Sequence, residues 1–131
     1  MCIRDSPRPD ERHARYADVP ALKSVVKTEL NVEGNPIPKF LKMVMKNQPH
    51  QCTLVPDAPD ALTSDAGWDT LKHKDFLTDT IAALKSKGIR TSIFINPDEK
   101  MIEGAKAVGT DRIEFYTGPY AHAYNLSLIH I

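Results

Sequence analysis

Strand-like and helix-like hydrophobic patterns follow one another along this chain. Residues 28–33 alternate between polar and apolar side chains, and residues 51–55, 90–95 and 112–116 form three more short runs that are typical of strands. Between these runs, apolar side chains recur at helical spacing in three groups: Phe40, Leu41, Val44 and Met45; Phe76, Leu77, Ile81 and Leu84; and Met101, Ile102, Ala105 and Ala107. The pattern therefore predicts four strands joined by three helices.

Proline, glycine and capping residues support these boundaries. Pro36 stands near the expected start of the first helix, and Pro49 follows its last apolar position. Gly88 lies where the C-terminal cap of the second helix is expected. The Asn-Pro-Asp run at residues 96–98 is typical of a helix start, and residues 117–119 predict one more helix after the last strand.

Strands that alternate with helices indicate a parallel α/β sheet, either doubly wound or closed as a (βα)₈ TIM barrel. Glu29, Asn31 and Glu33 share one face of their strand, while Leu30 and Val32 share the other. A doubly wound sheet needs two apolar faces, whereas a barrel can direct polar residues into its interior. We therefore expect about half of a TIM barrel, with four parallel strands.

The two ends of the chain look foreign. Met1–Ser6 and Leu126–Ile131 can be translated from one DNA element read in opposite orientations. That element resembles the transposon end used in sequencing-library preparation. We expect residues 1–6 and 126–131 to be non-native and residues 7–125 to be a partial barrel domain from a longer gene. The alternative is an ordinary N-terminus and a short C-terminal strand.

Charge and cysteine content narrow the classes of function. The 131 residues contain 17 Lys and Arg against 17 Asp and Glu, so the net charge gives no sign of a nucleic-acid partner. No apolar stretch of about 18 residues predicts a membrane-spanning helix, so we expect no membrane partner. Cys52 is the only cysteine in residues 7–125, which agrees with a cytoplasmic protein and a buried, inert thiol.

Candidate chemistry lies where the strands end, because α/β proteins bind ligands beyond the carboxyl ends of their parallel strands. Glu33 ends the strand with the polar face, and a carboxylate held there suits general acid–base catalysis. A solvated glutamate, or one paired with lysine, is the alternative. The charged run at residues 7–13 includes Arg8 and His13, which suit a phosphate site or simply a solvated loop.

The long polar loop at residues 58–69 is a candidate lid, or an excursion pinned by Trp68. His50 and Cys52 could share one strand face, but no second pair has metal-ligand spacing. We therefore interpret His50 as structural and expect no metal site.

Five segments carry a family resemblance: PRPDERH (7–13), ELNVEG (29–34), KNQPHQCTLVPDAPDALTSDAGWD (46–69), GIRTSIFINPD (88–98) and RIEFYTGPYA (112–121). Together they resemble pyridoxine 5′-phosphate synthases of vitamin B6 biosynthesis. The resemblance implies a (βα)₈ barrel that condenses 1-deoxy-D-xylulose 5-phosphate with 3-amino-2-oxopropyl phosphate to pyridoxine 5′-phosphate, phosphate and water. It further implies a cytoplasmic homo-octamer whose partners are phosphorylated small molecules and which needs no metal or organic cofactor.

The resemblance also implies residue roles. Glu33 matches the catalytic proton acceptor, Arg8 and His13 match positions that bind the deoxyxylulose phosphate, and Thr63 matches a substrate-binding threonine on a mobile loop. Ser6 stands where the family has a catalytic histidine. The family's first strand, second catalytic histidine and glycine-rich phosphate site have no counterpart in residues 7–125. We expect the parent protein to be the enzyme and this chain alone to be inactive.

Two alternatives remain open from the sequence. One is a different phosphate-binding TIM-barrel enzyme, which a Schiff-base lysine at a strand end would favour. The other is a non-catalytic half-barrel that only associates with partners. A half-barrel exposes two sheet edges and its interior face, so we expect weak secondary structure or self-association in solution.

Overall fold

The computed structural model of this chain describes residues 2–5, 7, 11, 14–56 and 66–125. Its strands are β1 (Cys2–Asp5), β2 (Glu29–Gly34), β3 (Gln51–Leu54), β4 (Arg90–Ile95) and β5 (Arg112–Phe115). Its helices are α1 (Asp18–Val25), α2 (Pro38–Asn47), α3 (Lys74–Lys85), α4 (Glu99–Ala107) and α5 (Gly118–Asn125). The four predicted strands and the predicted helices are therefore confirmed, and β1 and α1 precede them.

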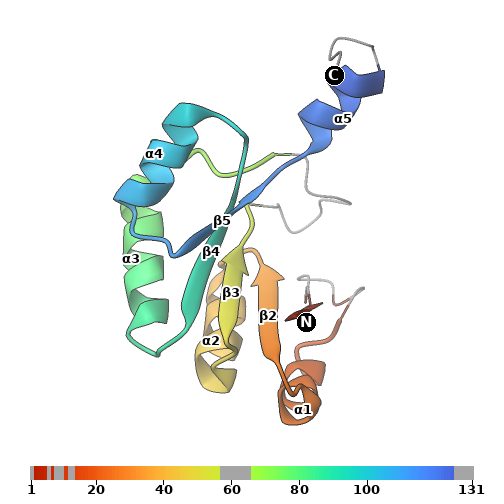
Figure 1. The fold of residues 1–131 in the computed structure, drawn as a ribbon. Coiled ribbons are helices and arrows are strands. Elements are labelled where there is room, and N and C mark those ends of the chain that lie inside the picture. The colour runs from red at the N-terminus through yellow and green to blue at the C-terminus, as the bar shows by residue number, and fades with distance from the viewer. Residues whose placement is uncertain (1, 6, 8–10, 12–13, 57–65, 126–131) are drawn as a thin grey trace.

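All described strands belong to one parallel sheet with the order β1-β2-β3-β4-β5 (Figure 1). In a doubly wound sheet the strand order reverses at a switch point. The order here follows the chain without a reversal, as in one arc of a βα barrel. The prediction of a partial TIM barrel is confirmed.

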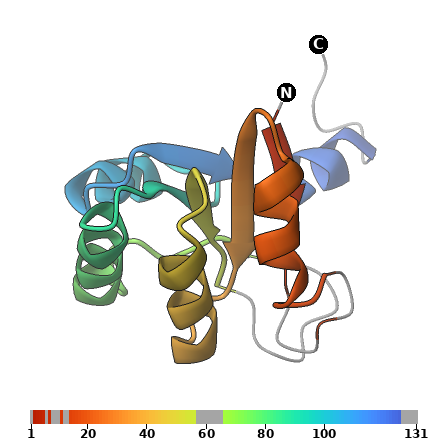
Figure 2. The same ribbon diagram turned by 90° about the horizontal axis from the view of Figure 1, so that it is seen from below.

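The hydrophobic core lies on one face of this sheet. Residues that share it are Leu30, Val32, Cys52, Leu54, Ile93 and Ile95 from the strands, and Val19, Phe40, Val44, Leu77, Ile81, Leu84 and Ala105 from α1 to α4. Helices that enter one core must lie on the same side of the sheet, and Figure 2 shows α2 and α3 there. The other strand face is polar, so it corresponds to the interior of a barrel.

A polar network ties the strands together at their amino ends on that interior face. Arg90 donates to both carboxylate oxygens of Glu29, at 2.9 and 2.7 Å, and to Oε1 of Gln51 at 2.8 Å. Arg112 donates to the same Gln51 oxygen at 3.1 Å. The hydrogen bond from Arg90 holds the pKa of Glu29 below its usual range. At the amino end of the interior face, the charged side chains are thus paired with one another or with the Gln51 amide.

Helix ends follow the signals in the sequence. The Asp98 carboxylate caps α4 by accepting hydrogen bonds from the backbone N–H groups of Lys100 and Met101. Gly88 follows α3 with a φ of +72°, a left-handed conformation that glycine adopts without strain. Gln48 ends α2 in the left-handed region, just before Pro49. These caps fix the short returns that lead into β3 and β4.

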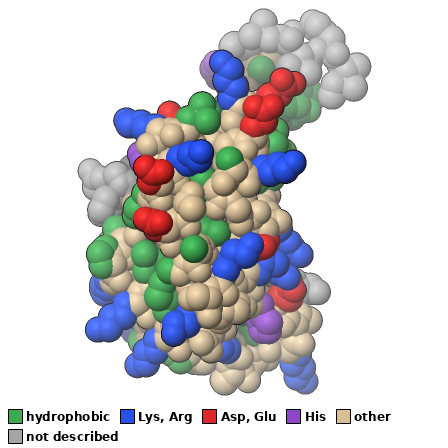
Figure 3. Space-filling view, turned by 90° about the vertical axis from the view of Figure 1, so that its left-hand side faces the viewer, with side chains coloured by type: hydrophobic (Ala, Val, Ile, Leu, Met, Phe, Trp, Pro, Cys, Tyr) green, Lys and Arg blue, Asp and Glu red, His purple; other side chains and the backbone are tan. Residues whose placement is uncertain are grey.

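The outer surface over α3 and α4 mixes positive, negative and apolar side chains (Figure 3). Across the described ranges, no helix is both long enough and apolar enough to span a membrane.

Asp111, just before β5, predicts a pH-dependent contribution to stability. Its carboxylate accepts hydrogen bonds from Lys85 Nζ at 2.8 Å, and from the N–H and Oγ1 of Thr91 at 2.8 and 3.0 Å. Burial alone would raise the pKa of Asp111, but these bonds outweigh burial and lower it. A lowered folded-state pKa stabilises the fold above the unfolded value of about 3.9, and this stabilisation is lost as the pH falls through the folded pKa.

We therefore expect Asp111→Asn to reduce the free energy of unfolding more at pH 7 than at pH 3. Urea denaturation followed by circular dichroism at the two pH values measures this difference. An equal reduction at both would show that the charge of Asp111 contributes nothing.

Candidate active site at the carboxyl ends of the strands

Glu33 lies at the carboxyl end of β2, on the polar interior face. Every paired strand is parallel, so the carboxyl ends of β2 to β5 meet at the same edge of the sheet. The side chain is half-buried, and its Oε2 atom is buried. The predicted position of Glu33 at the mouth of the interior is therefore what the structure shows.

Two aromatic rings lie on the same interior face. Phe94 alternates with the core residues Ile93 and Ile95, so it points to the polar side of β4. Its ring packs against Tyr116, which follows β5, with the ring centroids 5.8 Å apart and an interplanar angle of 55°. Sequence reasoning did not single out this pair, because residues 93–95 are all apolar and no local pattern shows that Phe94 faces the other side from its neighbours. The rings provide an apolar wall next to the polar strand ends.

Close packing behind Glu33 fixes the end of β2. A Cβ atom on Gly34 would lie 2.6 Å from Cε2 of Phe40, so only glycine lets α2 approach here. Phe40 is fully buried in the core, and the Gly34 carbonyl accepts a hydrogen bond from the Val55 N–H at 3.0 Å. The strand that carries Glu33 is thereby held from two sides, which suits a group that must meet a substrate at a defined place.

Cys52 lies in the core behind the site, on the neighbouring strand. Its side chain is fully buried. Burial, and then the negative charge of Glu33, raise the pKa of this thiol far above its usual range. The predicted burial of Cys52 is confirmed, and a raised pKa favours the protonated thiol.

The end of the long loop is anchored over the strand ends. Gly67 N–H donates to Asn96 Oδ1 at 3.1 Å. Trp68 donates from its backbone to the Phe94 carbonyl at 2.7 Å and from Nε1 to the Leu54 carbonyl at 3.0 Å. A Cβ on Gly67 would collide with backbone atoms of Ile95 and Asn96. Of the two interpretations of the loop, the structure supports a Trp68 pin for this end.

The other predicted site residues cannot be placed in this way. Arg8 and His13, expected to bind phosphate, lie outside the described residues, and so does Thr63. Among these four predicted site residues, Glu33 is the one that lies in the described part of the chain.

His50 has a structural role. Its Nδ1 accepts a hydrogen bond from the Leu30 N–H at 3.0 Å, at the amino end of β2 and far along the strand from Glu33. Within the described part of the chain, no three His, Cys, Asp or Glu side chains gather in a way that could hold a metal ion. The hydrogen bond to the Leu30 backbone agrees with the interpretation of His50 as a structural histidine.

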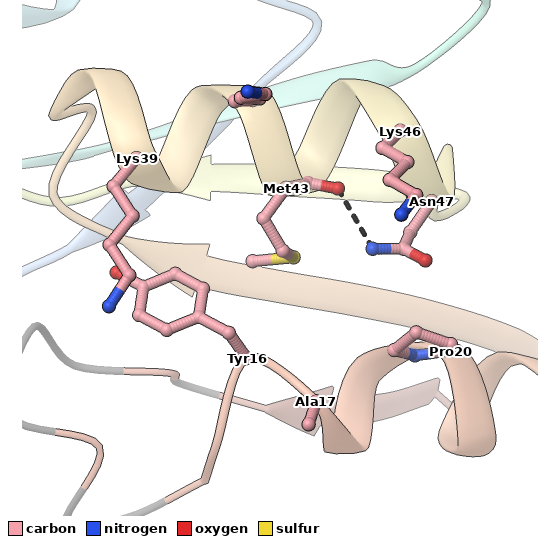
Figure 4. Close-up of a pocket in the computed structure, with 8 residues that line it drawn as sticks. Tyr16, Ala17, Pro20, Lys39, Met43, Lys46 and Asn47 are labelled. Atoms are coloured by element: carbon pink, nitrogen blue, oxygen red, sulfur yellow. Dashed lines mark hydrogen bonds between the residues drawn. The ribbon is translucent and has the colours of Figure 1, made fainter.

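A groove of about 370 Å³ lies between α1 and α2, on the helical side of the sheet (Figure 4). Tyr16, Pro20 and Met43 line it, and Lys39 Nζ lies 4.5 Å above the Tyr16 ring centroid. Burial, and then the charge of Glu11, raise the pKa of Tyr16. Because Glu33 points to the opposite face of the sheet, this groove is separate from the candidate site.

Comparison with known proteins identifies the family. The family described as "Pyridoxal phosphate biosynthesis protein PdxJ" matches residues 2–129. The chain belongs to this family. A curated pyridoxine 5′-phosphate synthase of Christiangramia forsetii is 59% identical to it over 115 residues, which cover 88% of this chain and 48% of that protein.

Other PdxJ relatives show the same extent of similarity. The pyridoxine 5′-phosphate synthase of Flavobacterium johnsoniae is 56% identical over 92% of this chain and 51% of its own length. The pyridoxine 5′-phosphate synthase of Cytophaga hutchinsonii is 53% identical over 91% of this chain and 50% of its own length. The chain therefore spans about half the length of the curated relatives that it matches.

Proposed function

We propose that the protein to which this chain belongs is a pyridoxine 5′-phosphate synthase. It condenses 1-deoxy-D-xylulose 5-phosphate with 3-amino-2-oxopropyl phosphate and releases pyridoxine 5′-phosphate, phosphate and water. The observation that carries this proposal is the PdxJ match over residues 2–129, supported by relatives of that name at 53–59% identity. A half-buried carboxylate at the mouth of a partial βα barrel is the group that this chemistry requires.

Glu33 acts as the proton acceptor in this proposal. Imine formation, elimination and ring closure all move protons, and a carboxylate on a rigid strand can accept and return them. Arg8 and His13 bind the phosphate of the deoxyxylulose substrate, and Thr63 contacts substrate from the loop. A guanidinium suits that task because it donates two parallel hydrogen bonds to a phosphate.

Two further properties belong to the same proposal. The complete protein works in the cytoplasm as a homo-oligomer, an octamer by family resemblance, on phosphorylated small molecules and without a metal or organic cofactor. The present chain is inactive by itself, because it spans about half of its relatives and carries Ser6 where the family has a catalytic histidine. None of the described strand ends carries a lysine, which gives no support to a Schiff-base barrel enzyme.

A chimera tests the function directly. Residues 7–125 replace the matching segment of the Christiangramia forsetii synthase, whose own residues supply the rest of the barrel. We expect the chimera to form pyridoxine 5′-phosphate from the two substrates, and the 131-residue chain alone to form none. The unmodified synthase is the positive control. A chimera that folds with native-like circular dichroism but makes no product would refute the proposal.

A further inference from the structure

The interior face of the sheet is polar along β2 to β5 except at one position. The side chains on this face are Glu29, Asn31, Glu33, Gln51, Thr53, Arg90, Ser92, Phe94, Arg112 and Glu114. Phe94 is the only apolar one among them. Its neighbours Ile93 and Ile95 are fully buried in the core, whereas Phe94 is half-buried on the other face. The Phe94 ring is therefore not part of the hydrophobic core, and core packing does not explain it.

A contact near the amino end of the sheet shows which interior residues of β2 and β4 lie at the same level. Arg90 reaches across β3 and donates to both carboxylate oxygens of Glu29, at 2.9 and 2.7 Å. By strand register, however, Arg90 is paired through β3 with Asn31 and not with Glu29. The level thus shifts by two residues between β2 and β4. Closed βα barrels show this stagger, and alternate strands supply the residues of one interior layer.

Glu33 and Phe94 stand in the same relation, four residues further along both strands. Register pairs Glu33 with Ser92 through β3, and the two-residue shift then brings it level with Phe94. Side chains of one layer in a barrel interior face the same space. The candidate proton acceptor and the Phe94 ring therefore border the same part of the mouth.

Tyr116 holds the Phe94 ring from the neighbouring strand β5 (Figure 1). The ring centroids are 5.8 Å apart and the rings are inclined at 55°, within the range in which aromatic pairs attract one another. Tyr116 is itself held in place. Its N–H donates to the Ile95 carbonyl at 2.8 Å, and a Cβ atom on Gly118 would collide with its ring. The two rings thus form a preorganised aromatic surface beside Glu33.

An aromatic surface at this place suits the end of the proposed reaction. Both substrates are open-chain phosphates, whereas the product contains a planar pyridine ring. A fixed aromatic ring attracts another planar ring by offset stacking or edge-to-face contact, and it gains less from a flexible open chain. The surface therefore distinguishes the cyclised species from the substrates.

We propose, on the basis of the synthase function proposed above, that the newly formed pyridine ring packs against Phe94. Tyr116 positions the Phe94 ring, and Glu33 borders the same space. Phe94 is thus a specificity-determining residue that favours the planar ring over the open-chain substrates. It takes no part in proton transfer.

Isothermal titration calorimetry of the chimeric synthase tests this role. Each variant is titrated separately with pyridoxine 5′-phosphate and with 1-deoxy-D-xylulose 5-phosphate. Phe94→Leu keeps an apolar side chain but removes the aromatic face, whereas Phe94→Tyr keeps that face. We expect the leucine variant to raise the Kd of the product about 3- to 10-fold, the range of one aromatic contact. The tyrosine variant should change it by less than about twofold, and the Kd of the open-chain substrate should change equally little in both.

Three results would overturn the role of Phe94. One is an unchanged product Kd in Phe94→Leu. Another is an equal loss of affinity for both ligands, because a residue that only supports the structure does not discriminate between them. The third is a Phe94→Tyr variant that binds the product as weakly as the leucine variant, because this variant retains the ring.

A second pair of variants tests the positioning role of Tyr116. Tyr116→Phe keeps the ring that packs on Phe94 and removes only the hydroxyl, whereas Tyr116→Leu removes the ring. We expect the phenylalanine variant to bind the product normally, and the leucine variant to bind it more weakly with little change for the open-chain substrate. Equal weakening in the two variants would show that the hydroxyl matters and not the packing of the rings.

Product formation by the same chimera distinguishes this role from the synthase function, because the titrations need no turnover. A folded chimera that makes no product would refute the synthase function, whatever Phe94 binds. A chimera that makes product, but whose Phe94→Leu variant keeps its preference for the product over the open-chain substrate, would refute the role of Phe94 alone.

Discussion

Glu33→Gln in the chimeric synthase is expected to lower kcat by about 10²- to 10⁴-fold, the range that a general acid or base contributes. Glutamine has nearly the same shape as glutamate, so the packing of Gly34 against Phe40 should persist. The amide cannot accept the proton, so the chemical step should be lost. Because the proton transfers occur after the substrates bind, KM should change much less than kcat. Steady-state kinetics of product formation measure both quantities.

Glu29→Gln is the matched control for this variant. Glu29 lies on the same strand and the same face, but at the amino end, where its carboxylate binds Arg90. Its replacement should leave kcat nearly unchanged. If Glu33→Gln retained more than about a tenth of the parental kcat, Glu33 would not be the proton acceptor.

Phe40→Ala is expected to produce the largest loss of stability, about 3–5 kcal/mol in the free energy of unfolding. The ring is 1% exposed and fills the space that Gly34 leaves behind the end of β2. Its removal takes away buried apolar area and leaves a cavity that the neighbouring strand cannot close. Urea denaturation of the chain at a fixed concentration, followed by circular dichroism, measures the loss.

Phe76→Ala is the matched control for Phe40→Ala, because it removes the same number of side-chain atoms from a partly exposed position. Phe76 is 45% exposed on α3, and its ring is tilted by 40° against that of Trp68, with the ring centroids 6.0 Å apart. Its truncation should therefore reduce stability by about 1 kcal/mol, a typical value for a partly exposed position. Comparable losses in the two variants would contradict the packing described for Phe40.

The sequence predicts this fold well where local pattern and tertiary environment agree. The strand-like run predicted at residues 90–95 matches β4 residue for residue, and its Ile93 and Ile95 lie in the core that the helices cover. Helix α1 was missed because Val19 is its only buried residue, which leaves almost no periodic signal. Strand β1 lies in a segment predicted to be non-native, and its extended form depends on pairing with β2.

Some features of the candidate site can likewise be predicted from local sequence, whereas others depend on tertiary contacts. Glu33 could be predicted because one strand, by itself, shows both its polar face and its end. The anchor between Gly67 and Asn96 joins residues 29 positions apart, so it arises only when β4 and the loop meet. The contact between Phe94 and Tyr116 likewise requires two strands to be adjacent in register. Such features depend on topology and not on any local pattern.

The anchored tryptophan gives the molecule its own optical probe. Trp68 is the single tryptophan of the chain, it is 7% exposed, and its indole N–H is hydrogen-bonded at the carboxyl end of β3. Selective excitation of indole therefore reports from the mouth of the barrel alone, without an introduced label. A red shift in emission would record water reaching the strand ends, and the same signal separates local opening at the mouth from global unfolding when it is compared with circular dichroism.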